Sequence, residues 1–289
     1  MKKLILLFLV AGCSVERGAS DWEPQQFSDA GPDLMVGVDG GIGEGPGAGT
    51  MDGTWLLLHE GSTCVINAEQ LTHAWYVVDI QQDDRVLTES RTICRVDLSP
   101  VLGLRVIIPP AAIDSIDFVD IDKGFVSDLR VGGSYSSSSE LALWGLELAN
   151  PVEDEVPGDA TDPGVVDGDG DGQPGVTFNV ENSTCQRFQG QRQIIRYSGK
   201  FDAPNSVIGT SVNLTDVKVY GSTEALCGIA PPVISNDNFS RFRMVRIDGA
   251  GGAINLDANA DGTISCEEAS QVFDQVMEFR AADNNNCKR

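Results

Sequence analysis

Twelve residues near the C-terminal end of the chain, 257–268, place oxygen-bearing groups at nearly every second position. They read Asp-Ala-Asn-Ala-Asp-Gly-Thr-Ile-Ser-Cys-Glu-Glu. A hard cation such as Ca²⁺ takes six to eight oxygen ligands, and carboxylates, amides and carbonyls supply them. Gly262 stands where a chain wrapped around one ion must turn sharply. The segment therefore predicts Ca²⁺ as a cofactor, with these candidate ligands: Asp257, Asn259, Asp261, Thr263, Ser265 and Glu268.

This spacing resembles the EF-hand family over the twelve positions and the helix expected after them, which is under a tenth of the chain. The resemblance implies side-chain oxygens from Asp257, Asn259 and Asp261, and the carbonyl of Thr263. It also implies a water-mediated contact through Ser265 and two oxygens from Glu268. The alternative is an ordinary cluster of turn residues, because Asp, Asn and Gly are common in loops.

The two flanks of the loop differ from each other. Apolar residues recur at helical spacing after Glu267, which predicts a helix over about 267–281. Before the loop, residues 242–247 alternate like a strand and residues 248–252 are rich in glycine, so no entering helix is expected. Sensor EF-hands change the angle between two helices. A strand–loop–helix arrangement therefore favours a structural clip over a switch.

A second acidic segment, 167–178, repeats the opening of the first. Asp167, Asp169 and Asp171 are spaced to converge on one cation, with Gln173 as a further candidate ligand. The segment resembles the calcium loops of thrombospondin type 3 and dockerin-like repeats. Its twelfth position is Phe178, which offers no oxygen, so a solvated acidic linker is the alternative.

The N-terminus carries an export signal. Two lysines precede an apolar run, Leu4 to Ala11, that is too short to span a bilayer. The following Val-Ala-Gly-Cys resembles a bacterial lipobox, which implies cleavage before Cys13 and lipid attachment there. Ser14, where inner-membrane retention usually needs Asp, favours the outer membrane of a Gram-negative cell. We expect an extracytoplasmic protein whose membrane contact is its lipid, with ordinary secretion as the alternative.

The chain is strongly acidic, with a formal charge of −23 over 289 residues. Phosphate binding needs clustered Lys and Arg, and the sequence has no such cluster. Nucleic acid is therefore excluded as an expected partner.

Six cysteines follow Cys13, and none lies at a metal-binding spacing, so disulfides are expected outside the cytoplasm. We expect Cys64 to pair with Cys94, the only other cysteine in the first half. The second half allows three connectivities, of which Cys185 with Cys227 and Cys266 with Cys287 is the preferred one.

Short strand-like runs separated by turns predict an all-β fold of antiparallel meanders, a sandwich or a barrel, with two possibly repeated halves and a C-terminal loop and helix. The expected organisation is a signal peptide (1–12), a Gly/Pro-rich tether (13–50), a first β domain (51–149), an acidic linker (150–175) and a second β domain with the loop and helix (176–289). The pattern resembles uncharacterised two-part β-rich lipoproteins, which implies no activity.

Catalysis is not expected. His59 and His73 are the only histidines, and neither lies in a nucleophile motif, so we expect both to be solvated or at a strand edge. The favoured function is a non-catalytic, calcium-binding, lipid-anchored cell-envelope protein. The alternative is a lipocalin-like barrel that carries a small apolar ligand, with a large interior cavity as the distinguishing feature.

Overall fold

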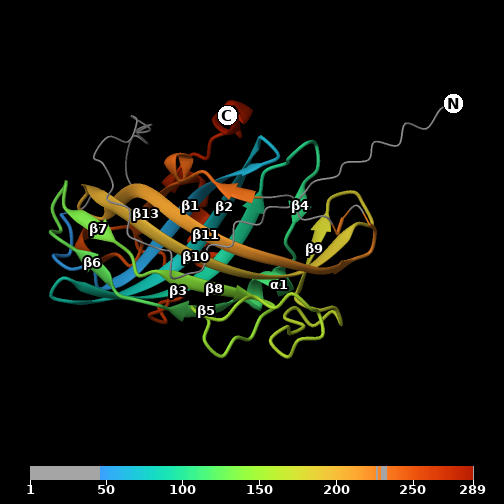
Figure 1. Cartoon of the computed structure of the whole chain (residues 1–289). Helices are drawn as coiled ribbons and strands as arrows, with labels where there is room; N and C mark the ends of the chain where they lie inside the picture. The colour runs from blue at the N-terminus through green and yellow to red at the C-terminus, as the bar shows by residue number, and fades with distance from the viewer. Residues whose placement is uncertain (1–45, 226, 229–232, 289) are drawn as a thin grey trace.

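A computed structural model describes residues 46–225, 227–228 and 233–288. The strands are β1 (Gly53–Val65), β2 (Ala68–Asp83), β3 (Val86–Leu98), β4 (Val106–Ile107), β5 (Asp117–Asp120), β6 (Gly124–Val126), β7 (Ser134–Ser136), β8 (Glu140–Trp144), β9 (Val176–Val180), β10 (Gln186–Ala203), β11 (Ser206–Ser222), β12 (Val233–Ser235) and β13 (Arg241–Arg246). The helical turns are α1 (Pro110–Asp114), η2 (Asp237–Phe239), η3 (Ala250–Gly252), α2 (Cys266–Ala269), η4 (Ser270–Val272), α3 (Phe273–Val276) and η5 (Asn284–Cys287). Figure 1 shows their arrangement.

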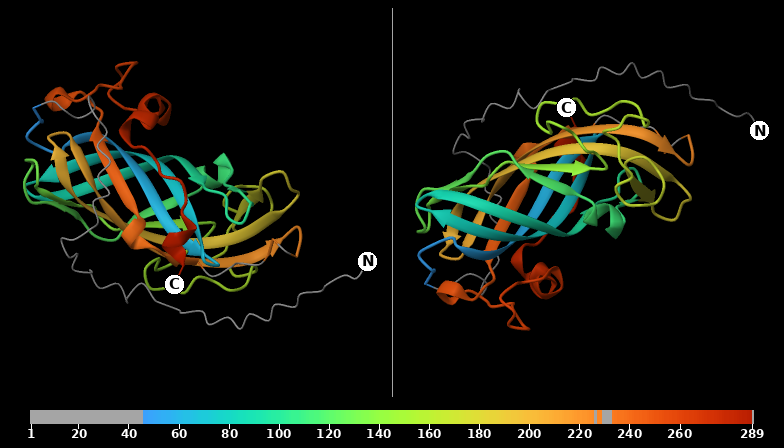
Figure 2. Two further views of the ribbon diagram at one scale, coloured as in Figure 1. Left: turned by 90° about the horizontal axis from the view of Figure 1, so that it is seen from above. Right: turned by 90° about the horizontal axis from the view of Figure 1, so that it is seen from below.

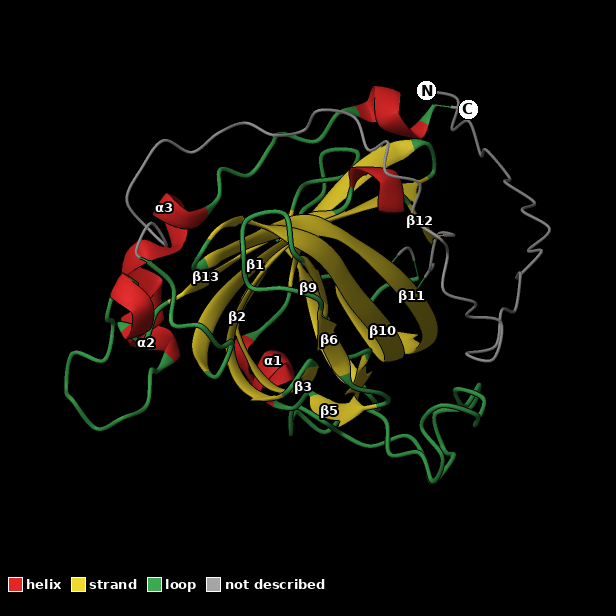
Figure 3. Ribbon diagram, turned by 90° about the vertical axis from the view of Figure 1, so that its left-hand side faces the viewer, coloured by secondary structure: helices red, strands yellow, loops and turns green. Residues whose placement is uncertain are grey.

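The strands form one antiparallel sheet that closes on itself. Eight strands follow each other around the ring in the order β11, β13, β1, β2, β3, β6, β7 and β10, and the long β10–β11 hairpin closes it. Figure 3 shows these strands arranged around a common axis. Strands β8 and β9 continue the sheet along β10 beyond β7, and β5 and β4 pair with them in turn.

The inside of the ring is filled by side chains. Residues of β1 alternate, so that Trp55 and Leu57 point inward while Leu56 and Leu58 point outward. The inner cluster has sixteen buried members, among them Tyr197 of β10, and they come from all eight ring strands. Because both faces of β1 are covered, its sequence is a continuous apolar run rather than an alternating one.

The C-terminal helical turns cover the outer face of β1, β2 and β13. Five residues at the predicted helical spacing are buried in this contact: Ala269, Val272, Phe273, Val276 and Met277. Full burial of each large apolar side chain contributes about 1.5–3 kcal/mol. Both views in Figure 2 place this segment, drawn in red, outside the sheet. The helical turns end at Val276 rather than near residue 281, and the chain continues extended from Met277.

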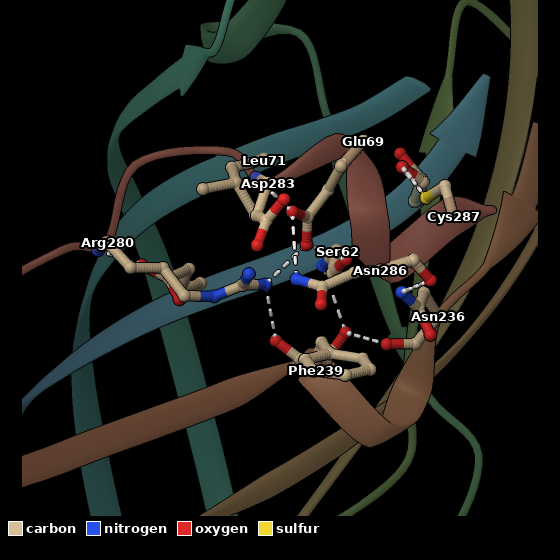
Figure 4. Close-up of polar contacts among 12 residues, drawn as sticks. Ser62, Glu69, Leu71, Asn236, Phe239, Arg280, Asp283, Asn286 and Cys287 are labelled. Carbon is tan, nitrogen blue, oxygen red and sulfur yellow. Dashed lines mark hydrogen bonds and ion pairs between the residues drawn. The ribbon is translucent and has the colours of Figure 1, made fainter. Parts of the chain in front are cut away.

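A buried carboxylate on β2 holds the tail that follows α3. Glu69, 1% exposed, pairs with Arg280 at 2.7 Å and accepts hydrogen bonds from the Asp283 N–H at 2.5 Å and the Ser62 hydroxyl at 2.7 Å (Figure 4). The Asn286 amide donates to the same carboxylate at 3.1 Å. Burying a charge is costly unless it is paired and hydrogen-bonded. The contacts of Glu69 with Arg280, Asp283 and Asn286 therefore hold the tail against β2.

A second buried carboxylate, Glu60 on β1, is neutralised in the same way. It pairs with Arg241 of β13 at 3.0 Å and with Arg280 of the tail at 2.7 Å. Arg280 therefore joins both carboxylates. If the tail left the sheet, Glu69 would lose its arginine partner and Glu60 would keep only Arg241.

Strands from both expected halves build this sheet, so 51–149 and 176–289 do not form separate sheets. β13 lies beside β1, and β10 lies beside β7 and β8. The all-β fold is confirmed, and the sequence left open whether it was one composite sheet or two domains. The short strands β5, β6, β7 and β12 were not predicted, because three to four residues carry little periodicity.

Candidate metal sites

In the 257–268 loop, the chain wraps around the first carboxylate. Asp257 lies between the end of β13 and the helical turns, and it accepts hydrogen bonds from the Asp261 N–H at 3.1 Å and the Gly262 N–H at 3.0 Å. Gly262 has φ +85°, as the sharp turn requires. Ala260 has φ +58°, which costs a residue with a Cβ about 1–2 kcal/mol. The backbone is therefore held in a curled form by its own carboxylate.

The last candidate ligand closes this loop. Glu268 is nearly buried and accepts hydrogen bonds from the Ala258 N–H at 3.0 Å, the Ser265 N–H at 2.9 Å and the Ser265 hydroxyl at 2.8 Å. Ser265 caps α2 in return, accepting from the Glu268 N–H. The Ser265 donors lower the pKa of Glu268, so this carboxylate is charged at neutral pH.

The middle of the loop joins the same network. Asn259 donates to Asp261 at 3.0 Å, and Asp261 accepts from the N–H and hydroxyl of Thr263 at 2.9 and 2.6 Å. The Thr263 hydroxyl lowers the pKa of Asp261. The loop thus gathers the predicted residues into one hydrogen-bonded unit. Leu256 before it and Ile264 within it pack into the outer cluster under α2 and α3.

The 167–178 loop has the same first half. Asp167 accepts hydrogen bonds from the Asp171 N–H at 3.1 Å and the Gly172 N–H at 2.8 Å. Asp257 likewise accepts from the residues four and five positions after it. Gly170 and Gly172 have φ +72° and +84°, matching positions four and six of the other loop. Two segments 90 residues apart therefore adopt one local fold around an aspartate.

The three aspartates of this loop converge. Asp167, Asp169 and Asp171 each bring a carboxylate oxygen within 4.8 Å of the others. One oxygen of Asp169 is buried and has no hydrogen-bond partner among the described residues. Gln173 takes part through its backbone N–H, which donates to Asp171 at 2.8 Å.

The second half of this loop differs, because β9 begins at Val176 instead of a helix. Phe178, at position twelve, is buried against Trp144. Thr177 instead reaches back, donating its N–H to Asp169 at 2.8 Å and its hydroxyl to Asp171 at 2.5 Å. The sequence interpretation missed Thr177. Successive side chains of a strand point to opposite faces, so Thr177 faces away from Phe178, and this alternation is the signal that could have identified it.

Both loops offer only oxygen donors, which suits Ca²⁺ or Mg²⁺ and not a thiophilic metal. Among the described residues, only Asp167, Asp169 and Asp171 bring three carboxylates within 4.8 Å of one another, whereas Asp257, Asp261 and Glu268 of the other loop do not converge to that degree. The charge of such a group is relieved by a divalent cation. The residues present therefore fit calcium.

Three disulfides are formed, and two differ from the expected pairing. Cys185–Cys227 is confirmed. Cys64 pairs with Cys287, and Cys94 pairs with Cys266, so the predicted Cys64–Cys94 and Cys266–Cys287 bonds were wrong. The sheet register explains the error. Cys64 faces Glu69 on β2, whereas Cys94 lies beside Trp75, about 20 Å further along that strand. A disulfide needs Cα atoms within about 7 Å.

These bonds place the loop at 257–268 under a direct constraint. Cys266, the tenth residue of the loop, is linked to β3, and Cys287 links the end of the tail to β1.

Three disulfides indicate an oxidising, extracytoplasmic environment.

The histidines lie elsewhere than expected. His59 is 2% exposed inside the ring, and its Nε2 lies 2.8 Å from the Ser211 hydroxyl. Burial lowers the pKa of His59 to about 3, so its imidazole is neutral at physiological pH. His73 is half-buried and stacks on Phe279 of the tail at 4.0 Å. The expectation of solvated or edge histidines was wrong, because both faces of β1 and β2 are covered.

No protein-family model matches the chain, and neither a curated protein nor a solved structure matches it. Within the described ranges, no helix is long and apolar enough to cross a membrane. The predicted lipobox and Cys13 lie outside the described residues.

Proposed function

We propose that the chain is a calcium-binding, lipid-anchored protein of the cell envelope, with a structural or binding role and no catalytic one. The observation that carries the proposal is the shared geometry of the two acidic loops. In both, the first aspartate accepts the N–H groups of the fifth and sixth residues, and positions four and six are left-handed.

The place of the 257–268 loop supports a bracing role. It joins the end of β13 to the helical turns that cover the sheet, and Cys266 ties it to β3. An ion bound there would neutralise carboxylates and hold the strand, the helical turns and the disulfide together. Because no helix enters the loop, the bound ion would brace the sheet rather than change an interhelical angle.

Calorimetric titration with Ca²⁺ tests this proposal. A loop without an entering helix or a partner loop is weakly preorganised, so we expect Kd values of about 10⁻⁴–10⁻³ M. Glu268→Gln removes one carboxylate oxygen and should abolish the heat from that loop, while Glu267→Gln, one residue away, should leave it unchanged. At ten times Kd, calcium should add about 1.4 kcal/mol to the free energy of unfolding. Identical melting of wild type and Glu268→Gln, with and without millimolar Ca²⁺, would refute the site.

A parallel pair of variants tests the other loop. Asp171→Asn removes a charge from the three converging aspartates, while Asp159→Asn does so at an exposed aspartate outside them. We expect only Asp171→Asn to lower the calcium stoichiometry. Unchanged stoichiometry would show that this segment is an acidic linker.

The anchor is tested in cells. Because the lipid would be attached at Cys13, Cys13→Ser should move the protein from the membrane fraction to the soluble fraction and abolish acyl labelling. A variant that still sediments with membranes in high salt would contradict lipid attachment. The outer membrane follows from Ser14, and density-gradient separation of the two membranes checks it.

The alternative, a lipocalin-like carrier of a small apolar ligand, is favoured by one observation, the closed ring of eight strands. The inside of that ring is packed with sixteen buried residues, including Trp55 and Phe201. An apolar ligand would have to displace these side chains, which makes this the weaker proposal.

A further inference from the structure

Two polar side chains, Arg187 and Gln189, lie beside the aromatic rings of Phe178 and Trp144 where β8, β9 and β10 meet. Arg187 of β10 lies opposite Phe178 of β9, and its guanidinium stands 5.7 Å from the centre of that ring. Phe178 contacts Trp144 of β8 edge to face at 6.0 Å. Gln189, two residues after Arg187, lies on the same face of β10 and is 1% exposed.

Three of these four side chains have a buried polar atom without a hydrogen-bond partner. The Trp144 Nε1–H, the Arg187 Nε–H and the Gln189 Oε1 make no hydrogen bond to any described residue. Trp144 is itself only 4% exposed. A buried donor or acceptor left unpaired costs about 1–3 kcal/mol, and native proteins have few of them. Hydrogen-bonding groups from outside the chain would satisfy the three atoms of this cluster.

The charge of the cluster indicates what that group is. Arg187 is half-buried and forms no ion pair with a described carboxylate, although the chain contains 43 acidic residues. Desolvation lowers the pKa of Arg187, and no neighbouring carboxylate opposes the effect. Arg91, a buried arginine inside the ring, shows the usual arrangement, because it pairs with both Glu89 and Glu140.

We propose that Arg187, Trp144 and Gln189 bind a small organic anion, a carboxylate carried on a flat apolar body. Arg187 and Trp144 would donate hydrogen bonds to the carboxylate oxygens, and Arg187 would neutralise their charge. The rings of Phe178 and Trp144 would contact the apolar body. Gln189 Oε1 would accept an N–H or O–H of the ligand. Phe178 is the last residue of the 167–178 loop, but none of the four side chains is among the candidate calcium ligands.

Indole ¹⁵N–¹H NMR tests the proposal, because the orphan Trp144 Nε1–H reports on its own hydrogen bond. Benzoate and hexanoate are added to the whole chain, with benzamide and hexanamide as uncharged counterparts, and Trp144→Phe assigns the signal. We expect at least one carboxylate to shift the Trp144 signal saturably and its amide to do so at least about tenfold more weakly, since a hydrogen bond to a charged group contributes about 1.5–3 kcal/mol.

Arg187→Gln should weaken the carboxylate about tenfold or more, and Arg187→Lys should retain part of the binding. Arg130→Gln, which removes an exposed arginine paired with Asp128, is the matched control and should bind as wild type. The proposal is overturned if neither carboxylate shifts the Trp144 signal, if the amides bind equally well, or if Arg187→Gln binds unchanged. Should Arg187→Gln fail to fold, the comparison of carboxylate with amide on the wild type and Arg187→Lys still decides.

Discussion

Single residues determine the form of the two acidic loops. Asp167 and Asp257 each accept two backbone N–H groups, and this fixes where the chain turns whether or not the position-four residue is glycine. Ala260 takes the left-handed conformation that Gly170 takes without cost.

At the same scale, the pH dependence of stability should reveal Glu69. Burial raises the pKa of Glu69, but the hydrogen bonds from Arg280, Ser62 and the Asp283 N–H lower it by more. The pKa therefore lies below its ordinary value of 4.5. The folded state then binds fewer protons than the unfolded state. The stabilisation is therefore present above about pH 4.5 and is lost as the pH falls through the folded pKa.

We expect the thermal midpoint of the wild type to fall as the pH is lowered from about 5 to about 3, and the fall to be smaller in Glu69→Gln, which has no such proton to bind. Asp274→Asn, at an exposed position of α3, is the control and should follow the wild type. Parallel curves for wild type and Glu69→Gln would show that Glu69 does not contribute to the acid sensitivity.

Among the elements, the short C-terminal helical turns depend on their attachment to the sheet. α2, η4 and α3 span only residues 266–276, a length at which an isolated helix is marginal in water. Packing against β1, β2 and β13 and the Cys94–Cys266 bond stabilise these helical turns.

The disulfide prediction follows from this dependence. The double variant Cys94→Ser/Cys266→Ser should lose about 2–5 kcal/mol of unfolding free energy. Because Cys266 begins α2, amide hydrogens of residues 257–276 should exchange faster than in wild type. The matched variant Cys185→Ser/Cys227→Ser removes a bond far from this segment in the sheet and should leave that exchange unchanged. Equal exchange of 257–276 in both variants would contradict the role given to Cys94–Cys266.

For the whole molecule, the decisive feature is that one closed sheet contains strands from both sides of the acidic segment 150–175. β1 pairs with β13 over six residues, and β10 pairs with β7 and β8. Neither half can bury the inner cluster alone, because Trp55 and Tyr76 come from one half and Tyr197 and Phe242 from the other.

We therefore expect a single unfolding transition by calorimetry, with equal calorimetric and van't Hoff enthalpies, in the oxidised protein. Tryptophan fluorescence and far-UV circular dichroism should change together. Two resolved transitions, or an expressed 51–149 fragment that melts cooperatively, would support independent domains instead.

The strand content, the long strands and the acidic loops could be predicted from the sequence alone, because each rests on spacing within a short segment. The Cys185–Cys227 pair was the preferred one of three connectivities that the sequence left open. The apolar face predicted after Glu267, from Ala269 to Met277, is the one that is buried. These features are local, so neighbouring residues carry enough information to specify them.

Tertiary structure alone decided which strands are neighbours, and through them the other two disulfides, the burial of His59 and the contact of Arg187 with Phe178. The pairing of β10 with β7 and of β13 with β1 joins residues far apart in the chain. Such pairing depends on the summed burial of both sheet faces, which no single segment encodes. Cys64 and Cys94 are close in sequence, yet the register of β1, β2 and β3 separates them and brings each to a cysteine of the C-terminal segment.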